Sequence, residues 1–189
     1  MAISAEAHAT PGIPAGKMGV WWFLASEIML FGGAISSFIV FRLGSAGWAG
    51  EAAHLSVPIA AVNTLVLLTS SLTMVQAFAM AERGDQRRLR NYLALTILLG
   101  LTFLGIKAYE YTAEIQAGFT PATGIFWSFY YTMTGLHALH VLAGAIVNFS
   151  LYVLVGGSLR NSHRVELAGL YWHFVDIVWI FLFPLVYLT

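Results

Sequence analysis

Five long apolar segments set the architecture that this chain can adopt. Each holds about 20 residues or more, which is the length that an α-helix needs to cross the ~30 Å hydrocarbon layer of a membrane. They are too long for strands, and they lack the strict alternation of an outer-membrane barrel. The sequence therefore predicts an all-α integral membrane bundle of five transmembrane helices, at about 18–41, 57–81, 92–111, 126–155 and 167–188.

The composition points the same way. Of the 189 residues, 59% are hydrophobic and 10% are charged, and the mean hydropathy is +0.77, whereas soluble domains carry about 25% charged residues. Nine basic residues balance nine acidic ones, so the chain lacks the net positive charge that is typical of proteins that bind nucleic acid. The sequence contains no cysteine, which excludes disulfides, iron–sulfur clusters, thiolate zinc sites and a cysteine nucleophile.

The positions of the basic residues predict how the helices are oriented. Lys17 precedes the first helix, four arginines lie within 83–90, and Arg160 and Arg164 lie between the last two helices. In a chain with five spans these three segments share one side, which the positive-inside rule identifies as the cytoplasm. We therefore expect a cytoplasmic N-terminus and a periplasmic C-terminus, although Arg42 opposes this orientation.

The chain shows one domain and no internal repeat. We expect this domain at 17–189, after a loosely ordered segment at 1–16 that is rich in Ala, Gly and Pro. The first apolar run is too long for the core of a signal peptide and lacks a strongly basic start, so it should stay uncleaved. Aromatic residues near predicted helix ends are expected in the interfacial belts of the membrane: Trp21, Trp22, Trp48, Trp127 and Tyr187.

Charged side chains inside the predicted spans need a partner or a task, because a charge at membrane depth costs about 2.5–3.5 kcal/mol. Glu27 has no basic residue near it on its own helix, so it is protonated, faces another helix or a lipid headgroup, or touches a water path. Lys107 and Glu110 are three residues apart and can pair on one helix face. Together with Glu114 we interpret them as a solvated helix end that contains this ion pair.

Two further pairs share the i,i+3 spacing, His137 with His140 and His173 with Asp176. Three histidines and a carboxylate could form a metal site, and histidines on different helices could hold haem. The simpler interpretation is that these side chains form hydrogen bonds between helices. The sequence has no HExxH or other closed metal signature, and spacing alone leaves both interpretations open.

Two segments near the C-terminus resemble subunit III of the haem–copper terminal oxidases. Residues 134–141 (TGLHALHV), with Gly144 after them, resemble one signature of that family, and residues 171–179 (YWHFVDIVW), with Glu166 before them, resemble its C-terminal ending. Further similar positions follow in family order: 26–27 with Phe31, 63–64, 70–71 and 110–111. The resemblance thus runs from about residue 21 to the C-terminus.

The chain departs from the family's pattern at two points. The long form has seven helices, whereas this chain has five and resembles the short bacterial form that lacks the first two. The lipid cleft between those two helices and the rest is therefore incomplete here. Lys107 stands where a glutamine is common in the family, so its pairing with Glu110 is particular to a subgroup.

The resemblance implies a subunit of an enzyme complex that has no catalytic centre of its own. In this family subunits I and II hold the haem and copper, reduce dioxygen to water and pump protons. Subunit III packs against subunit I, binds phospholipid and supports proton uptake at the inner face. The implied location is the bacterial cytoplasmic (inner) membrane, and the electron donor, cytochrome c or quinol, is set by subunit II.

The resemblance also implies roles for single residues. Glu27 is similar to the family's carboxylate that reacts with a hydrophobic carbodiimide, so we expect lipid binding or proton buffering there. We expect the same of three residues at the inner surface: Arg160, His163 and Arg164. The remaining polar residues of the spans are expected to make structural contacts between helices, with no metal ligand among them: His137, His140, His173, Asp176, Glu110 and Lys107.

Three other functions compete with this interpretation. An accessory protein of a nitric oxide reductase complex would have the same fold in a different assembly. A free-standing haem- or metal-binding protein would use His137, His140 and His173, and would hold metal when isolated. A proton or solute carrier would use Glu27 and Asp176, and would transport without partners.

Overall fold

The computed structural model describes residues 15–45, 47–155 and 162–188. This part of the chain is helical and contains no strand. Its helices are α1 (Ala15–Leu43), α2 (Trp48–Ala52), α3 (Val57–Glu82), α4 (Gln86–Gln116), α5 (Ile125–Val155) and α6 (Ser162–Tyr187). All except α2 are long and apolar enough to cross a membrane, which confirms the predicted all-α fold with five spans.

Two long helices extend beyond the spans that hydropathy predicted. α4 begins at Gln86 rather than at about 92, because Asp85 caps it by accepting the backbone N–H of Arg88 at 3.0 Å. α6 begins at Ser162 rather than at about 167. Hydropathy detects only the apolar part of a helix, whereas the backbone hydrogen bonds that define the helix continue into the polar turns at its ends. The short α2 lies in a segment that we predicted as loop.

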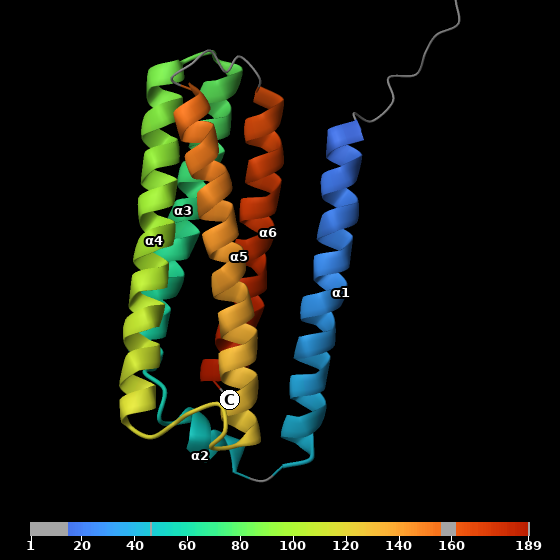
Figure 1. The fold of residues 1–189 in the computed structure, drawn as a ribbon, viewed down its shortest axis with the longest axis vertical. Helices are drawn as coiled ribbons and strands as arrows, with labels where there is room; N and C mark the ends of the chain where they lie inside the picture. The colour runs from blue at the N-terminus through green and yellow to red at the C-terminus, as the bar shows by residue number, and fades with distance from the viewer. Residues whose placement is uncertain (1–14, 46, 156–161, 189) are drawn as a thin grey trace, which may run out of the picture.

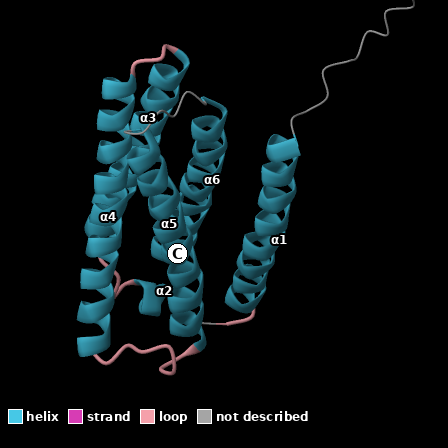
Figure 2. Cartoon of the chain, turned by 45° about the horizontal axis from the view of Figure 1, so that its top comes forward, coloured by secondary structure: helices cyan, strands magenta, loops and turns pink. Residues whose placement is uncertain are grey.

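Four of the long helices, α3, α4, α5 and α6, pack side by side as an antiparallel bundle (Figure 1). The α3–α4 connection is tight, and Gly84 adopts φ 72 there, in the left-handed region that favours glycine. α1 stands beside α5 and α6 and is separated from α3 and α4, as the turned view also shows (Figure 2). The buried share of the most apolar window is lowest in α1 and highest in α6, so α1 is the peripheral helix.

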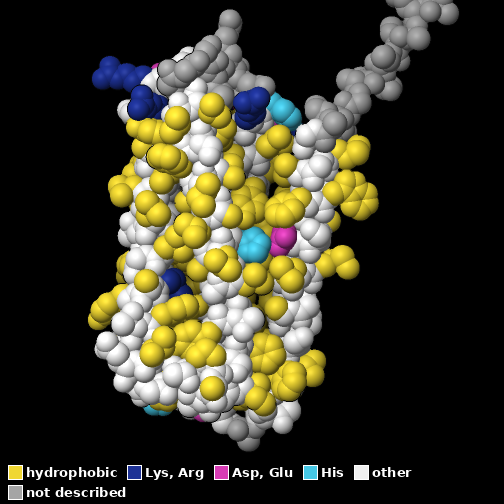
Figure 3. Space-filling view, viewed as in Figure 1, with side chains coloured by type: hydrophobic (Ala, Val, Ile, Leu, Met, Phe, Trp, Pro, Cys, Tyr) yellow, Lys and Arg dark blue, Asp and Glu magenta, His cyan; other side chains and the backbone are white. Residues whose placement is uncertain are grey.

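The start of α1, the α3–α4 turn and the start of α6 lie at one end of the bundle (Figure 1). Lysine and arginine side chains gather at this end on the face shown in Figure 3. The segments used to predict the orientation therefore do share one side. The side of the membrane that this end faces stays a prediction.

The aromatic residues near helix ends fall into two groups. Trp22 is 74% exposed on the outside of α1, as expected of a belt residue. Trp48, Trp127 and Tyr187 are buried, and Trp127 is fully enclosed. α2 and the α4–α5 connection cover the other end of the bundle, opposite the α3–α4 turn (Figure 1). There Phe119 stacks on Trp127, whose Nε1 donates to Glu51 at 2.6 Å. Our assignment of these three residues to an interfacial belt was wrong.

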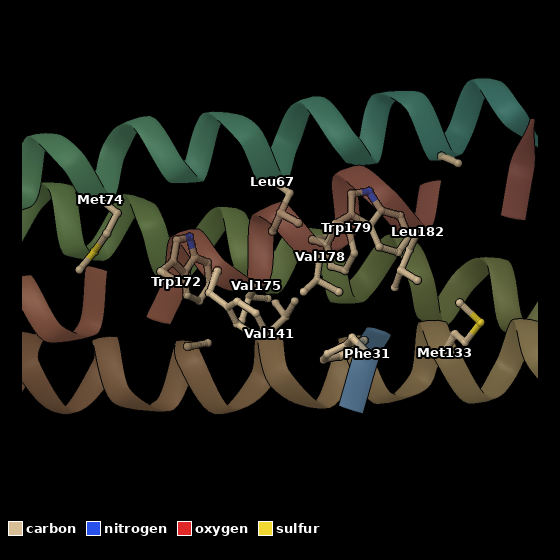
Figure 4. Packing of buried hydrophobic residues seen from close by; sticks show 14 of the residues in the cluster. Phe31, Leu67, Met74, Met133, Val141, Trp172, Val175, Val178, Trp179 and Leu182 are labelled. Carbon is tan, nitrogen blue, oxygen red and sulfur yellow. The ribbon is translucent and has the colours of Figure 1, made fainter. Parts of the chain in front are cut away.

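Two tryptophans of α6 point into the bundle and define successive layers of its core (Figure 4). The Trp172 ring lies between α4 and α5 at two glycines. A Cβ added at Gly100 would lie 2.7 Å from Cη2 of Trp172, and one added at Gly144 would lie 2.8 Å from Cε3. The indole Nε1 donates to Ser70 of α3 at 3.0 Å, so this one side chain joins all four helices.

Trp179 occupies the next layer along α6. Its Nε1 donates to Thr64 of α3 at 2.9 Å. Phe103 of α4 meets its ring edge-on at a centroid distance of 4.9 Å, and His137 of α5 stacks on it at 5.0 Å. Each of the four bundle helices thus contributes one side chain to this layer.

We expect Gly100→Ala to destabilise the protein, because Trp172 is enclosed on its other side by Gly144 and has no space to move away. Overpacking of this kind costs about 1–3 kcal/mol. Gly105→Ala on the same helix is the matched control, since a Cβ there meets nothing within 4 Å and alanine favours a helix. Unfolding in mixed detergent micelles measures both, and equal stability of the two variants would contradict this account of the layer.

Candidate functional site

The side chains of Glu27 and His140 meet across the interface between α1 and α5. Glu27 Oε2 lies 3.0 Å from His140 Nε2, and each side chain is 14% exposed. Acidic and histidine side chains meet within an otherwise apolar region of this face (Figure 3). Of the possibilities that the sequence left open for Glu27, the structure places it against another helix.

The other ring nitrogen of His140 determines how many protons this pair holds. Nδ1 lies 2.8 Å from the carbonyl oxygen of Leu136, which only accepts, so Nδ1 carries a hydrogen. The contact between Nε2 and Glu27 then needs one more proton, which resides on the carboxyl or on the imidazole. Either partner can therefore be the donor of this hydrogen bond.

A second polar contact holds α1 near its start. Lys17 Nζ donates to Glu166 Oε1 of α6 at 2.5 Å, and His163 Nδ1 lies 3.3 Å from Glu166 Oε2. Both carboxylate oxygens of Glu166 are therefore occupied. Lys17 and Glu27 are ten residues apart, about 15 Å along the helix, so two polar contacts attach α1 to the bundle.

A groove of about 490 Å³ lies between α1, α5 and α6. Arg164 lies at its charged end, and Val20, Ala143 and Leu167 contribute to its apolar walls. Tyr171 lines the groove and donates its hydroxyl to the carbonyl oxygen of His140 at 3.1 Å. Within the described part of the chain, Arg164 forms no ion pair or hydrogen bond. Arg160, predicted to act with it, lies outside the described residues.

The bundle interior holds a buried ion pair closed by two tyrosines. Lys107 Nζ lies 3.2 Å from Glu110 Oε2, 3.3 Å from the Tyr130 hydroxyl and 2.6 Å from the Tyr187 hydroxyl. Both hydroxyls donate to Glu110 Oε1, at 2.9 and 2.5 Å. Lys107 and Glu110 are only 2% and 3% exposed. The ion pair was predicted, but its description as a solvated helix end was wrong, because α5 and α6 enclose it.

His137 lies in the bundle core and makes no hydrogen bond to a described residue. Both ring nitrogens lack a partner, and the ring packs between Phe103 and Trp179. The interhelical contact that we expected of His137 is therefore aromatic packing rather than a hydrogen bond. Since His137 and His140 differ by about 60° around α5, one turns into the bundle and the other toward α1.

His173 and Asp176 lie at the interface of α6 with α3. His173 Nδ1 is 2.7 Å from the Ser71 hydroxyl. The buried carboxyl of Asp176 interacts with the same Ser71 hydroxyl of α3, although neither oxygen reaches full hydrogen-bond geometry. His137, His140 and His173 thus have three different sets of neighbours. Across the described residues, no three His, Asp or Glu side chains converge as metal ligands would.

Sequence reasoning missed several partners of these residues. Tyr130, Tyr187 and Ser71 were not singled out as partners, although all three contact titratable groups. The signal that could have found the tyrosines is their position, since antiparallel packing of α4, α5 and α6 brings residues 107, 130 and 187 to one level. That register becomes visible only when the neighbouring helices are known.

The chain matches known proteins over nearly its whole length. A family profile described as "Cytochrome c oxidase subunit III" matches residues 3–189. "Cytochrome c oxidase subunit 3" of Alkalihalophilus pseudofirmus is 37% identical over 90% of this chain and 85% of that protein. The protein of the same name in Synechocystis is 37% identical over 97% and 80%. A "Probable quinol oxidase subunit 3" of Staphylococcus haemolyticus is 33% identical over 91% and 88%.

The buried ion pair predicts a non-additive pattern of stability. Lys107→Met leaves Glu110 charged and buried without its cation, which should cost about 3–5 kcal/mol of unfolding free energy. Adding Glu110→Gln should recover part of this loss, because the amide oxygen still accepts from the two tyrosines. Unfolding in mixed detergent micelles measures all variants.

Arg88→Met is the control for this series. It breaks the exposed Arg88–Asp85 pair on the same helix, and exposed pairs contribute about 0–1 kcal/mol. A Lys107→Met variant as stable as Arg88→Met would contradict a structural role for the buried pair.

Proposed function

Because the chain belongs to the cytochrome c oxidase subunit III family, we propose that it is the non-redox subunit III of a bacterial haem–copper oxygen reductase. Its relatives are subunits of cytochrome c and quinol oxidases, so it is part of an oxidase complex. We place it as a multi-pass protein in the inner membrane beside subunits I and II, which would hold the haem and copper and reduce dioxygen.

The positions of the histidines support a role without a redox centre in this chain. His140 is engaged with Glu27, and His173 lies against Ser71. His137 is enclosed by aromatic rings. A bis-histidine haem or a metal ion needs two or more such side chains directed at one point. Each of these histidines instead fits the packing of a different helix interface.

The groove between α1, α5 and α6 is the observation that carries a lipid-binding role. It has a cation, Arg164, at the end of the bundle and apolar walls toward the membrane centre. A phospholipid has the matching order of groups, with a phosphate above acyl chains, and a basic residue beside an anionic headgroup contributes about 1 kcal/mol. A second groove of about 580 Å³, apolar except for His173, lies between α1 and α6 and suits further acyl chains.

The Glu27–His140 pair supports a role in proton buffering. The two side chains face each other at 3.0 Å, so each offsets the cost of placing the other at membrane depth. A proton between them could be carried by either partner. The cluster of Lys17, His163 and Glu166 lies nearer the end of the same interface, where protons would be exchanged with water at the predicted inner face.

The assembly role is tested by purification of the tagged chain in mild detergent. We expect subunits I and II to co-purify, identified by mass spectrometry, and a reduced-minus-oxidised spectrum to show their haem bands. The identity of subunit II then gives the electron donor. If the chain purifies alone with haem or metal of its own, the proposal fails and His137, His140 and His173 become candidate ligands.

Variants of the groove separate lipid binding from proton buffering. Arg164→Gln should lower the amount of phospholipid that each purified complex retains. It should also lower the number of turnovers that the complex completes before oxygen reduction stops. Glu27→Gln should leave the retained lipid unchanged but slow proton uptake, because the amide cannot take up a proton. Arg42→Gln, at the opposite end of α1, is the control for both measurements. Retained lipid that is the same in Arg164→Gln and Arg42→Gln would contradict the lipid assignment.

A further inference from the structure

A second charged concavity lies on a different pair of helices, where α4 begins and α5 ends. Its volume is about 430 Å³, and it is lined by Gln86, Arg87, Arg90, Asn91 and Val155. Unlike the grooves beside α1, it is lined mainly by polar residues, with Val155 as its apolar member. It lies at the same end of the bundle as the other basic residues, at the level where a membrane helix leaves the hydrocarbon.

The two arginines of this concavity have no acidic partner in the described chain. The ion pairs of this region join Arg88 to Asp85 and involve neither Arg87 nor Arg90. Arg90 lies over the ring of Tyr152 on α5 with Cζ 4.5 Å from the ring centroid, which restricts the guanidinium. A pair of uncompensated guanidinium groups on one concave surface suits a phosphate, which arginine binds through two parallel hydrogen bonds.

The surface below these arginines is apolar and faces outward. On α4, Arg87 and Asn91 share a helix face with Leu98, since they are spaced by four and seven residues, and Leu98 is 60% exposed. Leu95, four residues after Asn91 on the same helix, is also exposed. The order of groups along the helices is thus cationic and then hydrocarbon, which matches a phospholipid and not a free phosphate ion.

We propose that Arg87, Arg90 and Asn91 form a site for the phosphodiester headgroup of an anionic phospholipid whose acyl chains lie along α4 and α5. Basic pockets between transmembrane helices bind anionic lipid headgroups in this way. The site is separate from the groove at Arg164, because that groove is formed by α1, α5 and α6 on residues that this one does not share. The proposal for Arg87 and Arg90 therefore does not depend on lipid binding at Arg164.

Native mass spectrometry of the full chain in detergent micelles tests this site. The probes are phosphatidylglycerol, phosphatidylcholine with the same acyl chains, and inorganic phosphate. We expect phosphatidylglycerol to bind more tightly than phosphatidylcholine, and each of Arg87→Gln and Arg90→Gln to weaken it about fivefold. Arg88→Gln is the matched control, because it removes the same charge from the same turn of α4 but lies outside the concavity.

Three results would overturn the proposal. Equal loss in Arg88→Gln would show diffuse attraction by the basic end rather than a site. Equal binding of the two lipids would remove the need for an anionic headgroup. Displacement of phosphatidylglycerol by equimolar inorganic phosphate would assign the site to the free ion. In an Arg164→Gln background the fivefold losses should persist, and their disappearance would mean that the two sites are one.

Discussion

The buried pair of Lys107 and Glu110 fixes how α4, α5 and α6 lie against one another. Inside a membrane each polar group must find its partner within the protein. The three N–H groups of Lys107 find one acceptor on their own helix, one on α5 and one on α6. If α5 or α6 slid or rotated, a buried charge would lose its partner. The loss of stability would then be larger than the loss from apolar contacts alone. The pair therefore favours one register among many that hydrophobicity alone would allow.

The other layers of the core follow from this register. Trp172, Trp179 and Tyr187 are seven and eight residues apart along α6, about two turns each, so all three lie on its inner face. When Tyr187 is held by the ion pair, Trp179 comes level with Phe103, and Trp172 enters the slot at Gly100 and Gly144. The aromatic residues that dominate the C-terminal motif are thus explained by packing within one chain.

α1 is attached by different means, which bears on function. Its polar ties to the bundle are the contacts of Lys17 with Glu166 and of Glu27 with His140, and aromatic packing adds to them, as of Phe38 on Phe129. Grooves lie on both sides of it. Both polar ties of α1 involve titratable groups and lie next to space suited to acyl chains, which is not so for the apolar layers within the bundle. This is where the roles proposed for subunit III are concentrated.

The five spans could be predicted because hydropathy measures transfer into hydrocarbon, and the Lys107–Glu110 pair could be predicted because it is local. The partner of Glu27 could not, because His140 lies 113 residues away. Apolar residues surround each helix, so no amphipathic stripe marks the inward face as it does in a soluble protein.

The paired histidines show the consequence of this missing signal. Their spacing places His137 and His140 about 60° apart, and that angle sends one between Phe103 and Trp179 and the other toward Glu27. The same local pattern thus serves core packing at one position and a polar contact between helices at the other, and the neighbouring helices determine which role each histidine has.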